Sequence, residues 1–136
     1  MNVIELEKVS KLYMLGQTRV DALREVSLSI AQGEFLAIAG PSGSGKSTML
    51  HMFGCIDTPS SGSVRIDGKA TESMTDTELT RYRRLKISFI FQSFNLIPVL
   101  DVYENIEFPL LLQRSIGKAE RKERVKAALE RVAMSH

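Results

Sequence analysis

Nine consecutive residues have the composition of a loop that binds phosphate. They are Gly40, Pro41, Ser42, Gly43, Ser44, Gly45, Lys46, Ser47 and Thr48, and the first eight fit the pattern G-x-x-x-x-G-K-[ST] without a mismatch. The glycines at 43 and 45 let the main chain approach phosphate oxygens closely, because they can adopt conformations closed to residues with a Cβ. Lys46 is expected to reach the β- and γ-phosphates, Ser47 to offer its hydroxyl to Mg²⁺, and Thr48 to lie nearer the α-phosphate.

The flanking segments predict how this P-loop, residues 40–48, is positioned. The apolar run at 35–39 just before it is typical of a buried parallel strand, and residues 47–53 after it are predicted to be helical, with Gly54 as the C-cap. Loop amides and the positive end of the helix would then converge on one anion. The alternative is a plain glycine-rich turn in which Lys46 is solvated. The flanking pattern favours a nucleoside triphosphate site.

The remaining strand signals predict an α/β fold. Residues 3–9 and 22–30 have the apolar alternation of half-buried antiparallel strands, as do residues 63–66 before the hairpin dipeptide Asp67-Gly68. Residues 86–91 are continuously apolar after Lys86 apart from one serine, which predicts a second buried strand. We therefore expect a P-loop nucleotidase core with a partial parallel sheet, an antiparallel β-layer and the start of a helical subdomain.

Three further helices are predicted beyond the P-loop helix. Thr75 with Glu three residues later has capping-box spacing and opens a helix through Arg84. Asp101 has the same spacing and opens a helix that we expect to be bent or interrupted at Pro109. One face of a final helix is marked by three apolar residues, Val125, Leu129 and Val132.

Composition excludes several classes of protein. The 136 residues are 43% hydrophobic and 25% charged, with a net charge of +2 and no apolar run near the ~18 residues that a membrane-spanning helix needs. The basic stretches 81–86 and 118–131 are interpreted as solvated helix faces, so no nucleic-acid partner is expected. A single cysteine, Cys55, and the absence of a signal-peptide pattern after Met1 favour a reducing cytoplasm.

A metal-holding carboxylate is not apparent beside the P-loop. P-loop nucleotidases also need an aspartate at the end of a buried strand, which holds Mg²⁺ from the far side. Asp67 follows a strand-like run but belongs to a hairpin turn, and Asp101 is better explained as a helix cap. The strand predicted at 86–91 ends in Gln92, which by its position alone is an ordinary polar terminus or a site residue.

Taken together, these motifs resemble the ATP-binding subunit of an ABC transporter. The segments that carry the resemblance are 11–13, the P-loop, 59–62 and 91–96, and the resemblance covers essentially all of the chain. Residues 54–57 and 104–110 are similar to stretches of the branch that serves lipoprotein-releasing and macrolide-export systems. In place of the glycine common in that branch, this chain has Ser88.

The resemblance implies roles for residues outside the P-loop. Tyr13 would stack on adenine and Val20 would make an apolar contact to the base. An isolated tyrosine is better explained by packing beneath a strand end, but the place of Tyr13 about one strand pair before the P-loop favours contact with the base. Gln92 would contact Mg²⁺ and the attacking water, and would couple the nucleotide site to the membrane subunit. Residues 1–92 would then form the nucleotide-binding core and residues 93–136 the beginning of the helical subdomain.

The resemblance also implies partners and an activity. Members of this family hydrolyse ATP as pairs of subunits on permeases, at the cytoplasmic face of the inner (plasma) membrane. The sequence contains no Ser-Gly-Gly signature and no strand ending in Asp-Glu, and neither His51 nor His136 lies where the family has its switch histidine. We therefore expect the chain by itself to bind ATP and Mg²⁺ but to hydrolyse ATP negligibly.

Three alternatives remain open at this stage. The same P-loop pattern occurs in nucleotide kinases, although there the loop lies near the N-terminus. A soluble ABC-type ATPase of DNA repair or translation would share the motifs without a permease. The third alternative is a remnant that binds nothing. We expect this chain, when expressed alone, to be aggregation-prone or molten, because its apolar segments 35–39 and 87–91 would be exposed.

Overall fold

The structure is a computed structural model that describes residues 1–113 and 115–134. The chain forms two compact units, Met1–Phe89 and a second unit that begins at Ile90. The division lies close to the boundary expected after Gln92, and the identity of the second part as the start of a helical subdomain stays a prediction.

The first unit is built on a four-stranded antiparallel sheet in the order β2-β1-β3-β4. Its strands are β1 (Asn2–Leu15), β2 (Thr18–Ala31), β3 (Ser61–Ile66) and β4 (Lys69–Ala70). The predicted antiparallel layer is therefore confirmed, and β1 and β2 form a longer hairpin than the alternation indicated. Asp67 and Gly68 turn the chain between β3 and β4 with φ of 48° and 76°, as the Asp-Gly dipeptide predicted.

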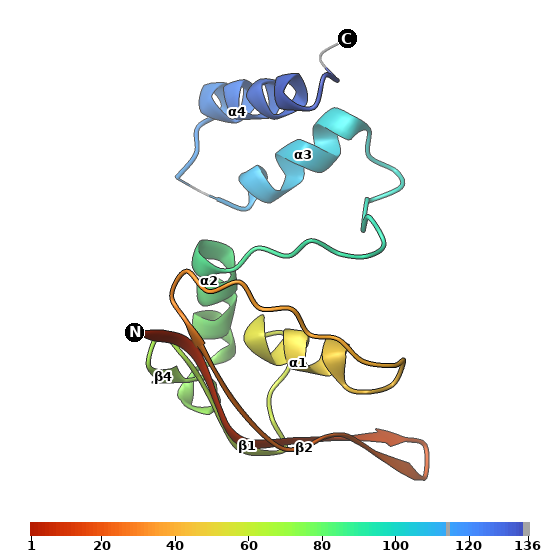
Figure 1. The fold of residues 1–136 in the computed structure, drawn as a ribbon. Coiled ribbons are helices and arrows are strands. Elements are labelled where there is room, and N and C mark those ends of the chain that lie inside the picture. The colour runs from red at the N-terminus through yellow and green to blue at the C-terminus, as the bar shows by residue number, and fades with distance from the viewer. Residues whose placement is uncertain (114, 135–136) are drawn as a thin grey trace. The chain divides into compact units, whose positions relative to one another are not determined.

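Two helices, α1 (Lys46–Phe53) and α2 (Asp76–Lys86), lie on one side of this sheet (Figure 1). A short 3₁₀ helix, Thr71–Ser73, precedes α2. The core of the unit is formed by buried apolar residues of the sheet, of α1 with its C-terminal turn, and of α2: Leu6, Val9, Leu23, Met52, Cys55, Val64, Ile66 and Leu79. The α1 helix, which carries the end of the P-loop, is thus held against the sheet by its own apolar face.

The ends of these two helices follow local chemistry. Thr75 and Glu78 form the predicted capping box at α2, with the Glu78 amide donating to Thr75 Oγ1 (3.3 Å) and the Thr75 amide to Glu78 Oε2 (2.8 Å). The bonds from the Thr75 amide and hydroxyl hold the pKa of Glu78 below its ordinary value. Gly54 is the C-cap of α1, as predicted, and is constrained by close approach, since a Cβ there would overlap the Phe89 ring.

The two segments predicted as buried parallel strands are not strands in the structure. Residues 35–39 and 87–91 have no assigned secondary structure, and Lys86 ends α2. Phe35 is 95% exposed and Ile90 fully exposed. A strand requires a neighbouring ladder, and the sheet in the described part of the chain consists of β1 to β4 alone. Apolar runs indicate what a segment can bury, whereas pairing depends on a partner strand that these residues do not supply.

The second unit contains α3 (Val102–Leu111) and α4 (Lys118–Arg131), which pack on each other around Val125, a fully buried residue. Arg121 Nε and Glu107 Oε1 form an ion pair of 3.3 Å between them. The interruption expected at Pro109 is wrong. The helix continues through Pro109 to Leu111, so the missing amide of the proline costs it one hydrogen bond without ending it.

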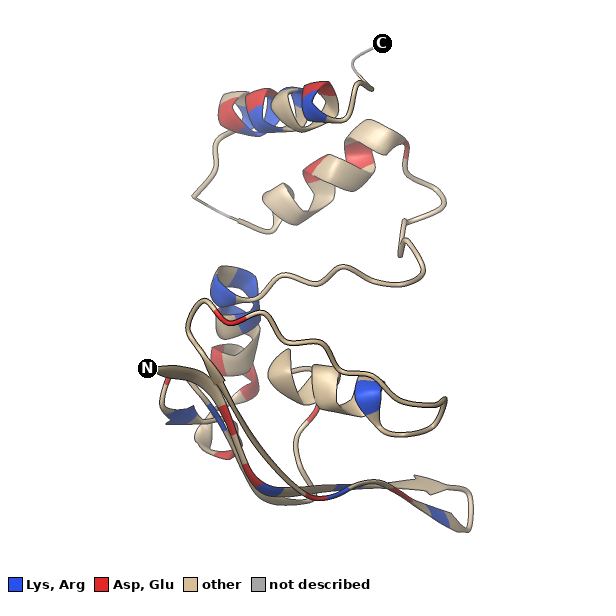
Figure 2. Cartoon of the chain, viewed as in Figure 1, with Lys and Arg blue, Asp and Glu red and all other residues tan. Residues whose placement is uncertain are grey.

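The two helices differ in charge. Lysine, arginine and glutamate alternate along α4, whereas α3 carries only two acidic residues (Figure 2). Arg124 and Glu120 pair at 2.6 Å on the exposed surface of α4, as expected of a solvated helix face. Among the residues that the structure describes, no helix has both the length and the hydropathy required to traverse a bilayer.

A single asparagine orders the segment before α3. The Asn105 side chain accepts a hydrogen bond from the Ile97 amide (2.8 Å) and donates to the carbonyls of Leu100 (2.9 Å) and Asp101 (2.8 Å). Asp101 caps α3 in the predicted capping box with Glu104. Together these contacts fix the chain that leads from residue 96 into the helix.

Candidate functional site

The P-loop and the β1–β2 hairpin line one pocket of about 270 Å³. Seven of its lining residues were predicted as site residues from the sequence: Tyr13, Val20, Gly43, Gly45, Lys46, Ser47 and Thr48. Asp21 and Ala22, which the sequence reasoning missed, complete the described lining. The structure therefore brings Tyr13 and Val20 to the P-loop, although about thirty residues separate them in the sequence.

The start of α1 is available to an anion. Gly45 is the N-cap, in the left-handed conformation with φ of 89°. No side chain caps the helix, and its first turn contains no acidic residue. The first helical hydrogen bond runs from the Met49 amide to the Gly45 carbonyl (2.9 Å). The amides of Lys46, Ser47 and Thr48 precede that bond, so they are the free donors with which a helix N-terminus binds phosphate.

A bulge in β2 fixes the distance between the hairpin and the P-loop. Lys11 pairs with Leu23 and the next residue of β1 pairs with Asp21, which leaves Ala22 as an extra residue of β2. The Ala22 carbonyl lies so close to Gly45 that a Cβ on Gly45 would overlap it. Glycine is therefore required at 45 both by its positive φ and by this close approach.

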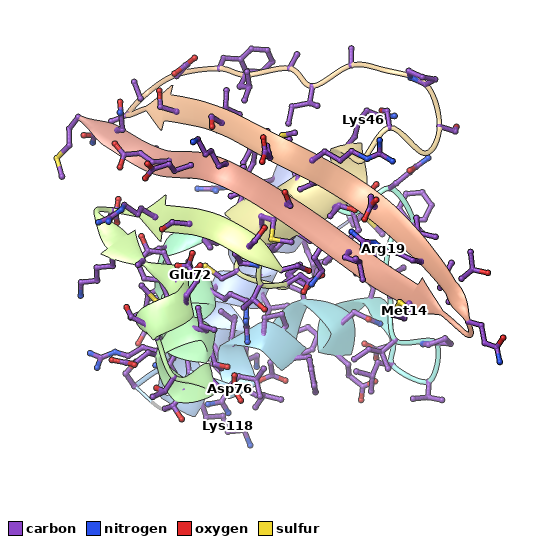
Figure 3. All side chains as sticks on the ribbon, turned by 90° about the horizontal axis from the view of Figure 1, so that it is seen from below. Met14, Arg19, Lys46, Glu72, Asp76 and Lys118 are labelled. Carbon is purple, nitrogen blue, oxygen red and sulfur yellow. The ribbon has the colours of Figure 1, made fainter. Side chains whose placement is uncertain are left out.

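The Lys46 ammonium is held by the loop that it follows. Its Nζ donates to the carbonyls of Gly40 (2.8 Å) and Pro41 (2.7 Å) and lies 3.5 Å from Ser44 Oγ. The Ser44 amide donates to the Pro41 carbonyl (3.3 Å), which closes the turn that contains Ser42. Figure 3 shows Lys46 at the start of α1 beside β2, with Met14 and Arg19 together at the far end of the hairpin.

Tyr13 both lines the pocket and is anchored by its hydroxyl. The Tyr13 hydroxyl donates to Asp57 Oδ2 (2.7 Å), and the Thr48 side chain lies near the same hydroxyl. Burial and the bond to Asp57 raise the pKa of Tyr13, and the Thr48 contact opposes them. Lys11 Nζ lies 5.0 Å from the centre of the ring. The two interpretations open in the sequence, base contact and packing at a strand end, are thus compatible in one residue.

Asp57 was missed as a residue of the site. Its Oδ1 accepts from Lys11 Nζ (2.5 Å) and from the Thr58 amide (2.8 Å). Burial acts to raise its pKa, but the hydrogen bonds from Lys11, Tyr13 and Thr58 outweigh it and hold the pKa of Asp57 below the usual value. The only sequence signal was its place after the P-loop helix, because the partners on β1 are more than forty residues away.

Other sequence candidates lie elsewhere. Gln92 is exposed in the second unit, and its role at a site in the first unit stays a prediction. Asp67 accepts a hydrogen bond from the Tyr82 hydroxyl (2.5 Å) in the β3–β4 hairpin, in keeping with a structural role. No group of three His, Cys, Asp or Glu residues in the described ranges could hold a metal ion. His136 lies outside the residues that the structure describes.

Comparison with known proteins extends these observations. Residues 23–136 match the ABC transporter family. Over 98% of its length the chain is 49% identical to an uncharacterized ABC transporter ATP-binding protein, MJ0796, of Methanocaldococcus jannaschii, of which it covers 56%. It is 41% identical, again over 98% of its length, to the macrolide export ATP-binding/permease protein MacB of Aggregatibacter actinomycetemcomitans, of which it covers 21%.

A solved structure shows the same fold. The chain matches the dimeric post-hydrolysis state of the ATP-binding cassette MJ0796 bound to ADP and Pi, with a TM-score of 0.84 and 46% identity. The match covers 93% of this chain and 56% of that one, so the chain spans a little over half the length of the relatives of this type. The predicted α/β class is confirmed by this likeness. The chain belongs to the ABC transporter family and comprises part of its ATP-binding domain.

Proposed function

We propose that this chain binds Mg-ATP in the pocket between the β1–β2 hairpin and the P-loop, as part of the ATPase subunit that powers an ABC transporter. The observation that carries the proposal is the uncapped N-terminus of α1, whose free amides line the same pocket as Tyr13. A phosphate chain satisfies these amides and a base covers the aromatic ring, so one nucleotide meets both requirements.

The lining residues divide into a base end and a phosphate end. Tyr13 and Val20 hold adenine, by stacking and by apolar contact. The amides at 45–48 and the Lys46 ammonium hold the phosphates, where phosphate oxygens replace the loop carbonyls that now accept from Lys46.

Magnesium fits this donor set only together with nucleotide. The described residues contain no acidic cluster that could hold the ion by itself. Mg²⁺ usually binds through substrate phosphates and a few protein oxygens, and Ser47 and Gln92 would supply them. When bound there, Mg²⁺ would supply neutralisation of the phosphate charge. By its sequence the chain offers no Asp-Glu pair at a strand end, so we expect negligible hydrolysis by these 136 residues without further protein.

The proposal is tested by ATP binding to a Lys46→Ala variant. Because the variant lacks one charge-assisted contact to phosphate, its affinity for ATP should be about 10- to 100-fold lower in titration calorimetry. Lys122→Ala is the matched control, because Lys122 is exposed on α4 in the second unit and should not change binding. Equal affinity of all three proteins would overturn the proposed site. ATP turnover by the purified chain that Lys46→Ala abolishes would contradict the expected lack of hydrolysis.

We also propose that the chain acts on the cytoplasmic face of the inner (plasma) membrane with permease subunits and a second ATPase subunit. The relative MacB is described as an ATP-binding/permease protein, and MJ0796 was solved as a dimer. Three exposed apolar side chains of the second unit follow Gln92 along the chain: Phe94, Leu96 and Val99. Such an apolar surface is suited to binding a protein partner. Recovery of the chain with membranes only when a permease is co-expressed would support this assignment, and Leu96→Asp should reduce it.

A further inference from the structure

We propose that Asp57 is a positioning residue that holds the Tyr13 ring in the orientation that receives the base of the nucleotide. The inference rests on the proposed function, since it concerns the base end of the same pocket. Asp57 is not among the lining residues, so it would act through Tyr13 and Lys11. The consequence is selective: it concerns the base and leaves the phosphate end unaffected.

The carboxylate joins three parts of the chain. Oδ2 accepts from the Tyr13 hydroxyl (2.7 Å), while Oδ1 accepts from Lys11 Nζ (2.5 Å) and from the Thr58 amide (2.8 Å). Lys11 also donates to the Thr58 carbonyl (2.7 Å). Lys11 and Tyr13 are two residues apart on β1 and therefore project to the same face of the strand. The loop after α1 is thus tied to the strand that carries the aromatic residue.

These bonds restrict the ring at its far end. A tyrosine has two side-chain torsions, and anchoring the hydroxyl on Asp57 limits the first, because the hydroxyl oxygen lies on the axis of the second. Lys11 Nζ, 5.0 Å from the ring centre, adds a contact with the ring itself. The side chains of Lys11 and Asp57 are only 12% and 25% exposed, so solvent screens their pairing incompletely. A ring that is already ordered loses less entropy when a base stacks on it.

A carboxylate is better suited to this task than the isosteric amide. Asp57 offers acceptors on both oxygens, and Lys11, Tyr13 and the Thr58 amide all donate to it. In Asp57→Asn one oxygen becomes an NH₂ group, which would face either the Lys11 ammonium or the Tyr13 hydroxyl. An NH₂ group facing Lys11 breaks that ion pair, whereas one facing Tyr13 makes the hydroxyl accept instead of donate, so the substitution alters one of the two β1 contacts at nearly constant volume.

The test compares ATP with inorganic triphosphate, which has phosphates and no base. We expect Asp57→Asn to lower the affinity for ATP by about 3- to 10-fold in titration calorimetry and to leave the affinity for triphosphate unchanged. The size of the effect corresponds to the cost of ordering one side chain. Asp67→Asn is the control, because Asp67 serves another tyrosine, Tyr82, in the β3–β4 hairpin. Equal weakening of both ligands, or of neither, overturns the inference. If the unaltered chain binds neither ligand, the proposed function itself fails and the inference with it.

A second variant tests the link if Asp57→Asn alters folding. Tyr13→Phe keeps the ring and removes the hydroxyl, so it should weaken ATP by the same factor, and the double variant should be no weaker than either single one. Additive losses, or full ATP affinity of Tyr13→Phe, contradict the proposal.

Tyrosine titration gives a readout that ligand binding does not affect. The chain has no tryptophan and three tyrosines, so Tyr82→Phe with Tyr103→Phe leaves Tyr13 as the only source of tyrosinate absorbance. In that background Asp57→Asn should lower the pKa of Tyr13 toward the ordinary value of about 10. An unchanged titration curve means that Asp57 does not hold the hydroxyl, and overturns the inference.

Discussion

At the scale of single residues, the P-loop end of the site is governed by backbone approach. Gly45 has a positive φ of 89° and faces the Ala22 carbonyl at a β-bulge, so its lack of a side chain is required twice over. Gly16, in the β1–β2 turn, also has a positive φ of 63°, but a Cβ there would meet no atom within 4 Å. A side chain at 16 would therefore meet conformational strain alone, whereas a side chain at 45 would meet both strain and steric overlap.

We expect Gly45→Ala to be more damaging than Gly16→Ala. The first should lower the free energy of unfolding by about 2–3 kcal/mol and abolish ATP binding, since α1 must move away from β2. The second should cost about 1 kcal/mol and leave ATP binding intact. Urea unfolding and calorimetry of the two variants measure both effects. Comparable losses in both would show that the bulge does not constrain the P-loop.

Asp57 gives a prediction about pH. Its pKa is lowered in the folded chain, so its contribution to stability is complete well above its ordinary pKa of 3.8 and is lost as pH falls through the lowered value. The difference in free energy of unfolding between the unaltered chain and Asp57→Asn should therefore be largest near neutral pH and vanish at strongly acidic pH. Urea unfolding at a series of pH values measures it. A gap that does not change with pH would refute the assignment.

At the scale of elements, local chemistry was predictable and pairing was not. The capping boxes at Thr75 and Asp101 and the Asp67-Gly68 turn were predicted because each depends on residues within a few positions of one another. The apolar run at 35–39 also had a clear local pattern, yet it forms no strand, because a ladder depends on a second segment. The sequence pattern thus predicts the ends of helices better than the membership of sheets.

The same distinction holds for the site. The P-loop pattern was recognisable because its chemistry lies in consecutive residues, whereas Tyr13 and Val20 followed only from a family resemblance. The contact between Tyr13 and Asp57 and the bulge at Ala22 could not be predicted, since both depend on how the hairpin meets the α1 helix. Long-range contacts of this kind leave no periodic signal in the sequence.

Asn105 tests how far one side chain orders an element. In Asn105→Ala the Ile97 amide loses its acceptor and the carbonyls before α3 lose their donors. We expect about a tenfold or greater fall in hydrogen-exchange protection around residues 97–101, which corresponds to about 1–3 kcal/mol for unsatisfied backbone groups. Glu123→Ala, on the exposed surface of α4, is the control. Unaltered protection would mean that the capping box alone orders the segment.

At the scale of the whole molecule, exposed apolar residues are a prominent property. Phe35, Ile90, Phe94 and Val99 are each at least 88% exposed. The relatives of this type are nearly twice as long as this chain, which covers 56% of MJ0796. We propose that in a full-length cassette further residues or partners cover these side chains. Studied by itself, the chain should behave as a protein with unsatisfied apolar surface.

This leads to a prediction about association. The 136-residue chain should bind the dye ANS and self-associate as concentration rises, and Phe35→Ser combined with Ile90→Ser should reduce both. Lys122→Ser, at an exposed charged position, is the control and should reduce neither dye binding nor self-association. Dye fluorescence and light scattering provide the measurement. A monomer that unfolds sharply in a two-state transition and binds no dye would be the opposite outcome.

In the proposed nucleotide site, the contact of Lys46 with its own loop has a consequence for the rate of nucleotide exchange. The ammonium has two carbonyl acceptors within the loop that it follows. Arrival and departure of nucleotide are then substitutions, in which one set of oxygen ligands replaces another around the same nitrogen. The pace of nucleotide loading is then set by how readily the lysine exchanges these partners.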